Sequence, residues 1–382
     1  MIGRRQRVAL ALTALLAAAA SCQNHARQNS AGAGLPAPPA ARGFTLVASG
    51  EILPHASVTD RARFDAGGSG YDFRPMLSAA EPAASHADLA LCHLGGVYGA
   101  DGDHGGPVPG APPQLAQGLT AAGYDGCSTA SEHALDDGAP GIRRTLEAMD
   151  RAGLQHAGTA RTDAEAGSVT LLRAGLARVA HLAYTYATAG PGLPPGQPWA
   201  VNLIDEQRIV SDARAARLAG ADVVVVSLHW GTAWQDAPDA AQVALADRLT
   251  ASRTNGRPDV DLILGTHAHV PQAYEKVNGT WVVYGLGDQI AGEMYNDRGV
   301  RDSRGNESTL ARFTFAPPTR PGGRWRVTRA EFVPQMYDLD AGRVVDVDRA
   351  IARGADLHGV RDRIRDVVLS RGAAGDGLVT GR

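Results

Sequence analysis

Short apolar runs, each followed directly by small or chemically active residues, constrain the fold of this chain more than any other feature. The runs occupy residues 44–51, 88–96, 124–133, 179–186, 222–231, 261–269 and 281–288. Continuous apolar runs of this length predict strands that are buried on both faces of a sheet. Polar residues at the ends of such strands are well placed for chemistry, because ligands in α/β folds bind beyond the carboxyl ends of the strands.

Helical patterns separate several of these runs. Residues 139–152, 206–219 and 238–252 have the spacing of amphipathic helices. The first of them has Pro140 near its start and Gly153 just past its end, which are the residues expected at those two positions. Strands that alternate with helices predict an α/β fold with a largely parallel or mixed sheet.

The rest of the chain after the apolar runs has a different pattern. Residues 307–340 alternate like antiparallel strands and are expected to flank the core or to form a second sheet. Residues 343–382 are expected to be a C-terminal helical extension that becomes Gly-rich and frayed. No internal repeat is evident. We expect one domain over residues 44–342.

Composition and charge exclude several classes of protein. Apolar residues make up 44% and charged residues 20% of the 382 residues, which excludes a disordered or fibrous chain. The net charge is 37 − 40 = −3 with no long basic run. Nucleic acid binding driven by phosphate neutralisation is therefore not expected. Three cysteines are too few for a disulfide scaffold.

The N-terminus has the pattern of an export signal. A basic segment, 1–7, precedes an apolar segment, 8–20, which is too short to span a bilayer as a helix because about 20 residues are needed. We therefore expect a signal peptide over 1–21. The small residues before Cys22 resemble a lipoprotein cleavage site, so Cys22 is a candidate for lipidation. Ordinary signal cleavage with a free Cys22 thiol is the alternative. Residues 22–43 are expected to be a flexible tether.

Five of the twelve histidines lie at the ends of the apolar runs, and they are His93, His133, His229, His267 and His269. Neutral imidazole is the commonest metal ligand in proteins. In an extended segment, residues i and i+2 project to the same side, so His267 and His269 could both reach one small volume. Two hydrogen-bonded loop histidines are the alternative for this pair. Because the fold would gather the strand ends, the five together predict a metal site.

These segments resemble the CapA family of bacterial capsule and poly-γ-glutamate synthesis proteins, which belongs to the metallophosphatase superfamily. The resemblance runs from about Phe44 to Ala291 and is carried by SGEILPH, ADLALCHLGG, GYDGCSTASEHALDDG, ADVVVVSLHWG, DLILGTHAHVPQ and WVVYGLGD. It implies a four-layer α/β/β/α metallophosphatase-like sandwich. It also implies a divalent metal centre at the strand ends, holding one or two ions of Mn, Zn or Fe, and a place in envelope polymer assembly.

The chain departs from the family at the carboxylates. Gly50-Glu51 replaces Gly-Asp, Leu94-Gly95 replaces Leu-Glu, and Glu132-His133 replaces Asn-His. An anionic bridge offsets the repulsion between two divalent ions, and Gly95 cannot supply one. Our hypothesis is that Glu132 partly replaces this bridge, with Glu51 as a further ligand. The alternative is that the second ion is lost and that the site holds one ion or none.

Compared with the family, the chain keeps three histidine ligands and differs at two further positions. His229, His267 and His269 match family ligands, whereas Thr266 replaces a histidine and Gly287-Asp288 replaces Gly-Asn.

Other residues have expected roles around the metal. His133 is a candidate proton donor to a leaving group, with a structural histidine as the alternative. Arg161 and His93 are candidate substrate-binding residues, since an arginine can hold an anion with two hydrogen bonds; a surface salt bridge is the alternative for Arg161. Cys92 and Cys127 end neighbouring runs, and in an oxidising compartment we expect a disulfide between them. Two buried thiols are the alternative.

Two functions are compatible with these features. The first is a hydrolase at the outer face of the cytoplasmic membrane that cuts a phosphoester or an amide bond in an anionic envelope polymer. The second is a non-catalytic envelope protein that binds polymer or capsule-assembly proteins and retains a partial metal site. The histidines favour the first function, and the altered carboxylates favour the second.

Overall fold

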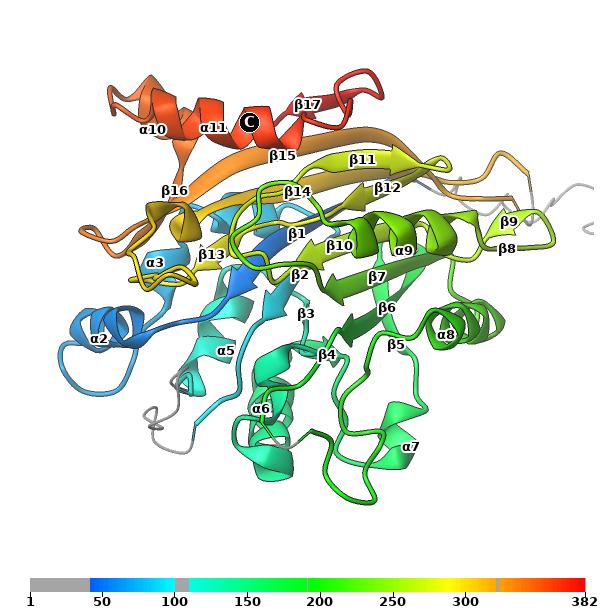
Figure 1. Cartoon of the computed structure of the whole chain (residues 1–382), viewed down its shortest axis with the longest axis horizontal. Helices are drawn as coiled ribbons and strands as arrows, with labels where there is room; N and C mark the ends of the chain where they lie inside the picture. Colours follow the sequence, from blue (N-terminus) through cyan, green and yellow to red (C-terminus); the bar gives the residue numbers. More distant parts are fainter. Residues whose placement is uncertain (1–41, 100–109, 191, 321–322, 382) are drawn as a thin grey trace, which may run out of the picture. The chain divides into compact units, whose positions relative to one another are not determined.

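The computed structural model describes residues 42–99, 110–190, 192–320 and 323–381 (Figure 1). The predicted signal peptide, most of the tether and Cys22 lie outside these ranges. Within them, two sheets pack face to face, and a short β8–β9 hairpin (Arg253–Thr254 and Arg257–Pro258) lies apart from both.

The first sheet has the order β16-β15-β14-β1-β2-β3-β4, with β13 beside β1 and β17 beside β15. Its strands are β1 (Phe44–Ile52), β2 (Leu89–Leu94), β3 (Gly126–Ser128), β4 (Gln155–Ala157), β13 (Asp288–Ile290), β14 (Glu307–Ala316), β15 (Arg326–Asp338), β16 (Arg343–Asp346) and β17 (Leu378–Thr380). The neighbours β1 to β4 run parallel to one another, so their carboxyl ends meet at one edge.

The second sheet has the order β11-β12-β10-β7-β6-β5. Its strands are β5 (Thr170–Ala174), β6 (Ala177–Thr185), β7 (Val223–His229), β10 (Leu262–Thr266), β11 (Tyr274–Val277) and β12 (Thr280–Val283). Here β6, β7, β10 and β12 are parallel. The structure is therefore a mixed α/β fold, as the alternating pattern predicted.

Three apolar clusters define a four-layer α/β/β/α sandwich. Along β1, Leu46 and Ala48 belong to the cluster between the two sheets, whereas Val47 belongs to the cluster on the outer face of the first sheet. The inner cluster also takes Val223 and Val225 from β7. Because successive strand residues point to opposite faces, a strand that is apolar throughout supplies both clusters.

Helices cover the two outer faces. The first sheet is covered by α2 (Ala56–Asp65), α3 (Arg74–Leu77), α4 (Glu81–Ser85), α5 (Gln114–Ala121) and α6 (Gly138–Ala152). The second sheet is covered by α8 (Glu206–Leu218) and α9 (Ala240–Ala251), which lie against β6 and β7 in Figure 1. A short helix, α7 (Asp163–Ala166), precedes β5. Gly153 ends α6 at φ 76°, in the left-handed conformation that glycine adopts at low cost.

The C-terminal segment differs from the expected helical extension. It contains α10 (Val347–Ala352) and α11 (His358–Val368), but it begins with β16 and its last strand, β17, pairs in parallel with β15. Ile364 and Val368 of α11 are buried in the inner cluster. This burial makes the segment part of the domain. β16 pairs only with Gln335–Asp338 on the outer edge of β15, so Ala330–Phe332 remain available on that edge for β17. Within the described ranges, no helix has the length and apolar character needed to cross a bilayer.

Cys92 and Cys127 lie side by side on adjacent strands. They are directly paired in the β2–β3 register, their Cα atoms are 4.4 Å apart, and the structure joins them by a disulfide. The bond links two neighbouring parallel strands that lead to the site described next.

Candidate metal centre

Four parallel strands deliver candidate ligands to one edge of the sandwich. Glu51 ends β1, His93 lies near the end of β2, His229 ends β7 and His267 directly follows β10. His93 is on the inner face of β2 with Leu91, and His229 is on the inner face of β7 with Val225, since alternate residues share a face. The side chains therefore converge between the two sheets.

A β-bulge turns Glu51 into the site. The register of β1 against β2 is Ala48 with Leu91 and then Glu51 with His93, so β1 holds one extra residue. In a regular strand, Glu51 would point to the opposite face from Ala48, because it lies three residues further along; the bulge returns it to the same face. Gly50 permits the bulge, because a Cβ there would lie 2.0 Å from the carbonyl oxygen of Gly287.

Glu51 occupies the space that a side chain at position 95 would need. A Cβ on Gly95 would lie 2.1 Å from Glu51 Oε1 and 2.9 Å from its carboxyl carbon. The longer side chain at position 51 therefore requires the absence of a side chain at position 95. A carboxylate reaches this part of the site from β1, where the family pattern supplies it from the end of β2.

Glu132 reaches the histidines from a 3-10 helix, η1 (Glu132–Leu135). One of its carboxylate oxygens contacts His229 Nε2, and Oε1 lies 3.2 Å from His267 Nδ1. Ser131 fixes the start of η1, because its hydroxyl accepts from the backbone N–H of His133 and donates to the carbonyl of Gly95 at 2.6 Å. Glu132 thus joins the ligands, which is the position that our bridge hypothesis requires.

His267 and His269 reach the site by a route that the sequence did not indicate. We expected an extended segment, but both residues have positive φ, 92° and 59°. Such a backbone is unfavourable for residues other than glycine and is found where the surrounding structure enforces it, commonly at functional sites. The loop between β10 and β11 is thus wound tightly, and both rings still reach the cluster, with centroids 6.0 Å apart.

Asp288 is a site residue that the sequence analysis noted but did not assign. It begins β13, is fully buried, and accepts a hydrogen bond from His269 Nδ1 at 3.0 Å. The signal was present, since Asp288 directly follows the last apolar run where the family has asparagine. With Glu132 also replacing asparagine, two carboxylates are gained where Gly95 loses one.

The donor atoms form three overlapping groups that fit metal ions. They are Glu51, His93 and His229; Glu132, His229 and His267; and Glu51, His269 and Asp288, with the donors of each group within 4.8 Å of one another. Several of these donors are buried without a hydrogen-bond partner among the described residues, and they are Glu51 Oε2, His93 Nε2 and Asp288 Oδ1. Buried polar atoms without a partner are costly, and a bound cation would satisfy them.

Burial sets the ionisation of the metal-free site. It raises the pKa of the Glu51 carboxyl well above its usual range, and the nearby Asp288 carboxylate raises it further. Burial also lowers the pKa of His229 to about 4, despite the opposing effect of Glu132. For His269, burial lowers the pKa, but the Asp288 carboxylate together with Glu51 and Glu132 reverses this effect and raises the pKa to about 9. A dication would reverse the carboxyl shifts, because it stabilises the ionised form.

The remaining predicted residues differ in position. His133 lies beside the ligands, and its Nδ1 is 2.9 Å from Asp136 Oδ2, with its side chain 17% exposed. His93 is only 3% exposed, the Ser128 hydroxyl contacts its Nδ1 at 2.7 Å, and it lies among the candidate ligands. The expected role of His93 in substrate binding stays a prediction.

Arg161 is not brought to the cluster. Its guanidinium is held by Glu165 and by Asp150, with the Asp150 contact at 2.6 Å. Of the two interpretations of Arg161, the structure places it in the salt bridge, where two carboxylates use the donors that an anionic substrate would need.

Two aromatic residues, Tyr186 and Trp234, border the site. Tyr186, which follows β6, has its ring 4.6 Å from that of His267 and is 48% exposed. Trp234 has its ring 5.5 Å from that of His269. Tyr186 lies between the mostly buried ligands and the solvent, because it is half exposed and its ring is close to His267.

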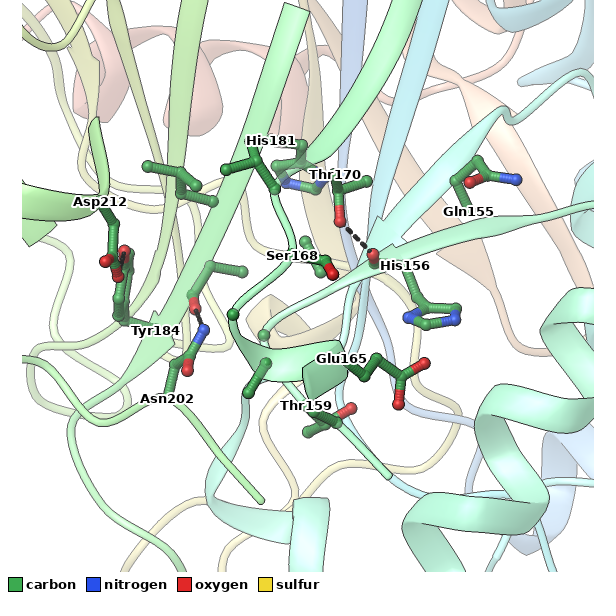
Figure 2. A pocket seen from close by; sticks show the side chains of 18 of the residues that line it. Gln155, His156, Thr159, Glu165, Ser168, Thr170, His181, Tyr184, Asn202 and Asp212 are labelled. Atoms are coloured by element: carbon green, nitrogen blue, oxygen red, sulfur yellow. Dashed lines mark hydrogen bonds between the residues drawn. The ribbon is translucent and has the colours of Figure 1, made fainter. Parts of the chain in front are cut away.

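A separate pocket of about 450 Å³ lies between β4, β6 and α7 and contains none of the predicted site residues (Figure 2). Several of its polar groups are already satisfied within the protein. Thr170 donates to the carbonyl of His156 at 2.8 Å, and Tyr184 donates to Asp212 at 2.8 Å. The metal-ligating chemistry of the described residues is therefore at the strand ends and not in this pocket.

Sequence comparison shows the family to which this chain belongs. Residues 45–293 match the family described as bacterial capsule synthesis protein PGA_cap, and the chain belongs to that family. Probable polyglutamine synthesis accessory proteins of Mycobacterium tuberculosis are 29% identical over 251 residues, which cover 60% of this chain and 62% of theirs. The capsule biosynthesis protein CapA of Bacillus anthracis is 27% identical over 180 residues, which cover 46% of this chain and 42% of that protein. The chain thus spans less than two thirds of the length of these relatives.

Similar solved structures include phosphoesterases. A putative 5'-nucleotidase from Staphylococcus aureus has a TM-score of 0.46 at 15% identity, covering 85% of this chain and 58% of that chain. The calcineurin-like phosphoesterase YfkN from Bacillus subtilis has a TM-score of 0.46 at 13% identity, covering 85% and 98%.

The Glu51–Gly95 arrangement predicts the effect of one methyl group. We expect Gly95→Ala to displace the Glu51 carboxylate, to lower metal affinity at least about tenfold and to cost about 1–3 kcal/mol of unfolding free energy. Adding Glu51→Asp should restore part of both losses, because the shorter side chain vacates the space. Metal titration and thermal unfolding measure these effects.

Gly359→Ala is the matched control, since nothing lies within 4 Å of a Cβ built there. Equal effects of Gly95→Ala with and without Glu51→Asp would contradict the proposed exchange.

Proposed function

We propose that the protein is a metal-dependent hydrolase of capsule-polymer metabolism, tethered to the outer face of the cytoplasmic membrane. The observation that carries the proposal is the convergence of seven donor residues in overlapping triads, with buried donor atoms that have no other partner. Membership of the capsule synthesis family supports the polymer context. The bond cut would be a phosphoester or an amide of an anionic envelope polymer.

The donor set indicates which ion would be held. Imidazole nitrogens together with carboxylate oxygens suit Mn, Zn or Fe, and thiolates are absent from the three groups. His229 belongs to the group of Glu51 and His93 and also to the group of Glu132 and His267, so it would lie between two neighbouring positions. A bound divalent ion supplies a hydroxide near neutral pH and polarises a phosphoryl or carbonyl oxygen.

His133 is positioned to deliver a proton. Asp136 holds its Nδ1, which leaves Nε2–H free to donate, and Nε2 lies 3.8 Å from Glu132 Oε1 at the border of the ligand cluster. Burial lowers the pKa of His133, but the hydrogen bond that it donates to Asp136 and the negative charges of Asp136 and Glu132 together outweigh burial, so the net shift of the pKa is upward. A larger protonated fraction at neutral pH suits a general acid that acts on a leaving group.

The altered carboxylates favour a second function, that of a non-catalytic binding or assembly protein. A binding or assembly protein could keep the ion as a structural element without turnover. The buried position of Glu51 and the close contact of Glu132 with His229 are consistent with a structural ion as well. Hydrolytic activity separates the two functions.

The first test loads the purified protein with Mn²⁺ and measures metal content and hydrolysis of an aryl phosphate. We expect one to two bound ions per chain, and activity at least about a hundredfold lower in His267→Ala, because loss of an outer partner of a ligand alone costs 10–100-fold. His358→Ala is the control, since His358 is exposed at the start of α11. A protein with no bound metal contradicts both functions, and bound metal without hydrolysis supports the second.

The second test concerns the proton donor. We expect His133→Gln to slow phenyl phosphate hydrolysis by about 10²–10³-fold and to affect p-nitrophenyl phosphate much less, because a good leaving group needs little protonation. Steady-state kinetics on both substrates provides the measurement. Equal losses on the two substrates would show that His133 acts only by supporting the site.

The third test concerns the tether. We propose that Cys22, which lies outside the described residues, carries the lipid anchor. Metabolic labelling with a fatty acid should mark the wild-type protein, and Cys22→Ser should abolish the label and move the protein to the soluble fraction. Unlabelled wild-type protein in the soluble fraction would exclude the anchor without bearing on the metal centre.

A further inference from the structure

A second pocket, of about 510 Å³, has an unusual concentration of positive charge. Its basic lining residues are Arg253, Arg257, Lys276, Arg324 and Arg326, and its acidic lining residue is Asp261. The whole chain carries a net charge of −3, so this concentration is local. We refer to it as the basic pocket.

The positive charge of the basic pocket is not neutralised within the protein. Asp261 is already engaged by Arg217 behind the pocket and by the backbone N–H of Val224 at 2.9 Å, while Arg324 Nε lies 3.4 Å away. Arg257 donates to the backbone carbonyl of Asp222 at 2.5 Å, and no ion pair holds it among the described residues.

The exposed basic residues of the pocket, Arg253, Lys276 and Arg326, have the fewest polar partners among the described residues. The guanidinium of Arg253 donates to the carbonyl of Asn278 at 3.3 Å, and Lys276 lies over the ring of Trp281 at 5.6 Å. Neither these two residues nor Arg326 forms an ion pair in the part of the chain that the structure describes. Elsewhere in that part, many arginines face carboxylates directly, as Arg161 and Arg343 do.

The basic pocket and the metal centre lie at opposite ends of the sandwich. Asp261 precedes β10 and lines the pocket, whereas His267 follows β10 and belongs to the metal centre. From Asp261 to His267 the chain advances six residues along β10, which separates the two sites by roughly 20 Å at about 3.3 Å per residue. In Figure 1, β1 and β7 point away from the β8–β9 hairpin, which carries Arg253 and Arg257.

The aromatic walls indicate the kind of anion that fits. Trp281 and Trp325 are 3% and 5% exposed, so their faces are covered and cannot stack on bases or enter a membrane. A concave site with several cations and closed aromatic walls favours a flexible chain that carries repeated oxyanions. A flat lipid surface or a nucleic acid would need exposed rings or a protruding basic face.

We propose that the basic pocket binds a carboxylate-bearing segment of an anionic polymer, independently of the metal centre. The choice of polymer rests on the proposed function, whereas the anion preference rests on the charges of the pocket. Arginine and lysine side chains bind carboxylates through charge-assisted hydrogen bonds, and several such contacts along one chain add to the affinity. The pocket holds the polymer and takes no part in bond cleavage.

The test measures binding of a labelled poly-γ-glutamate oligomer of about ten residues to the full-length protein by fluorescence anisotropy. We expect the oligomer to bind, the dissociation constant to rise with salt, and Arg253→Gln/Lys276→Gln/Arg326→Gln to weaken binding at least tenfold. These three residues are exposed and outside ion pairs, so their replacement should leave the fold intact, which thermal unfolding verifies.

Arg143→Gln/Arg298→Gln/Arg353→Gln removes the same charge from exposed arginines elsewhere and should bind within twofold of the wild type. Equal weakening in the two triple variants, or no weakening in either, overturns the proposal. Tighter binding to anionic phospholipid vesicles or to a single-stranded oligonucleotide than to the oligomer also overturns it.

Binding should persist in the presence of EDTA and in His267→Ala. Loss of binding under either condition assigns the oligomer to the metal centre and overturns the independent pocket. If the protein lacks hydrolytic activity but binds the oligomer as expected, the proposed function fails while the basic pocket stands.

Discussion

Buried negative charge at the strand ends is the constraint on which the rest of the site depends. Glu51, Glu132 and Asp288 lie within or beside a group of four imidazoles, and Glu51 and Asp288 are almost completely buried. Carboxylates withdrawn from water are strongly destabilised unless a cation or hydrogen-bond donors compensate them. His269 compensates Asp288 in part, but unpartnered donor atoms remain on Glu51 and on His93. The geometry of the fold therefore favours the binding of a dication at this edge of the sandwich.

The altered carboxylates form a rearranged site and not merely a damaged one. Glu51 fills the space beside Gly95, and Glu132 contacts His229 from η1. Each change is accommodated by backbone features that hold the side chain in place, namely the bulge in β1 and the hydroxyl of Ser131 that fixes η1. Positive φ values at His267 and His269 add strain that the packed sheets must offset. A bulge and strained backbone conformations gathered at one place are typical of a functional site.

The sandwich separates two kinds of electrostatic environment. Its carboxyl-end edge concentrates carboxylates and imidazoles suited to a cation, while the opposite end has an excess of basic side chains suited to an anion. About 20 Å of strand between them keeps their direct interaction weak, since the Debye length at physiological salt is about 8 Å. Our two proposals assign a polymer to one of these ends and a metal ion to the other.

The sequence alone determined the central buried strands of both sheets, the helices α6, α8 and α9 and the clustering of imidazoles, because burial on both faces requires continuous apolar runs and the carboxyl ends of parallel strands meet at one edge. It also indicated Glu132 and the His229, His267 and His269 set through the family resemblance. Only the tertiary structure decided how these residues meet. The bulge that turns Glu51 inward, the contact between Glu51 and Gly95 and the place of Asp288 all depend on backbone approaches between segments far apart in the chain. The strand pairing of the C-terminal segment and the capture of Arg161 by carboxylates likewise depend on neighbours that periodicity does not encode.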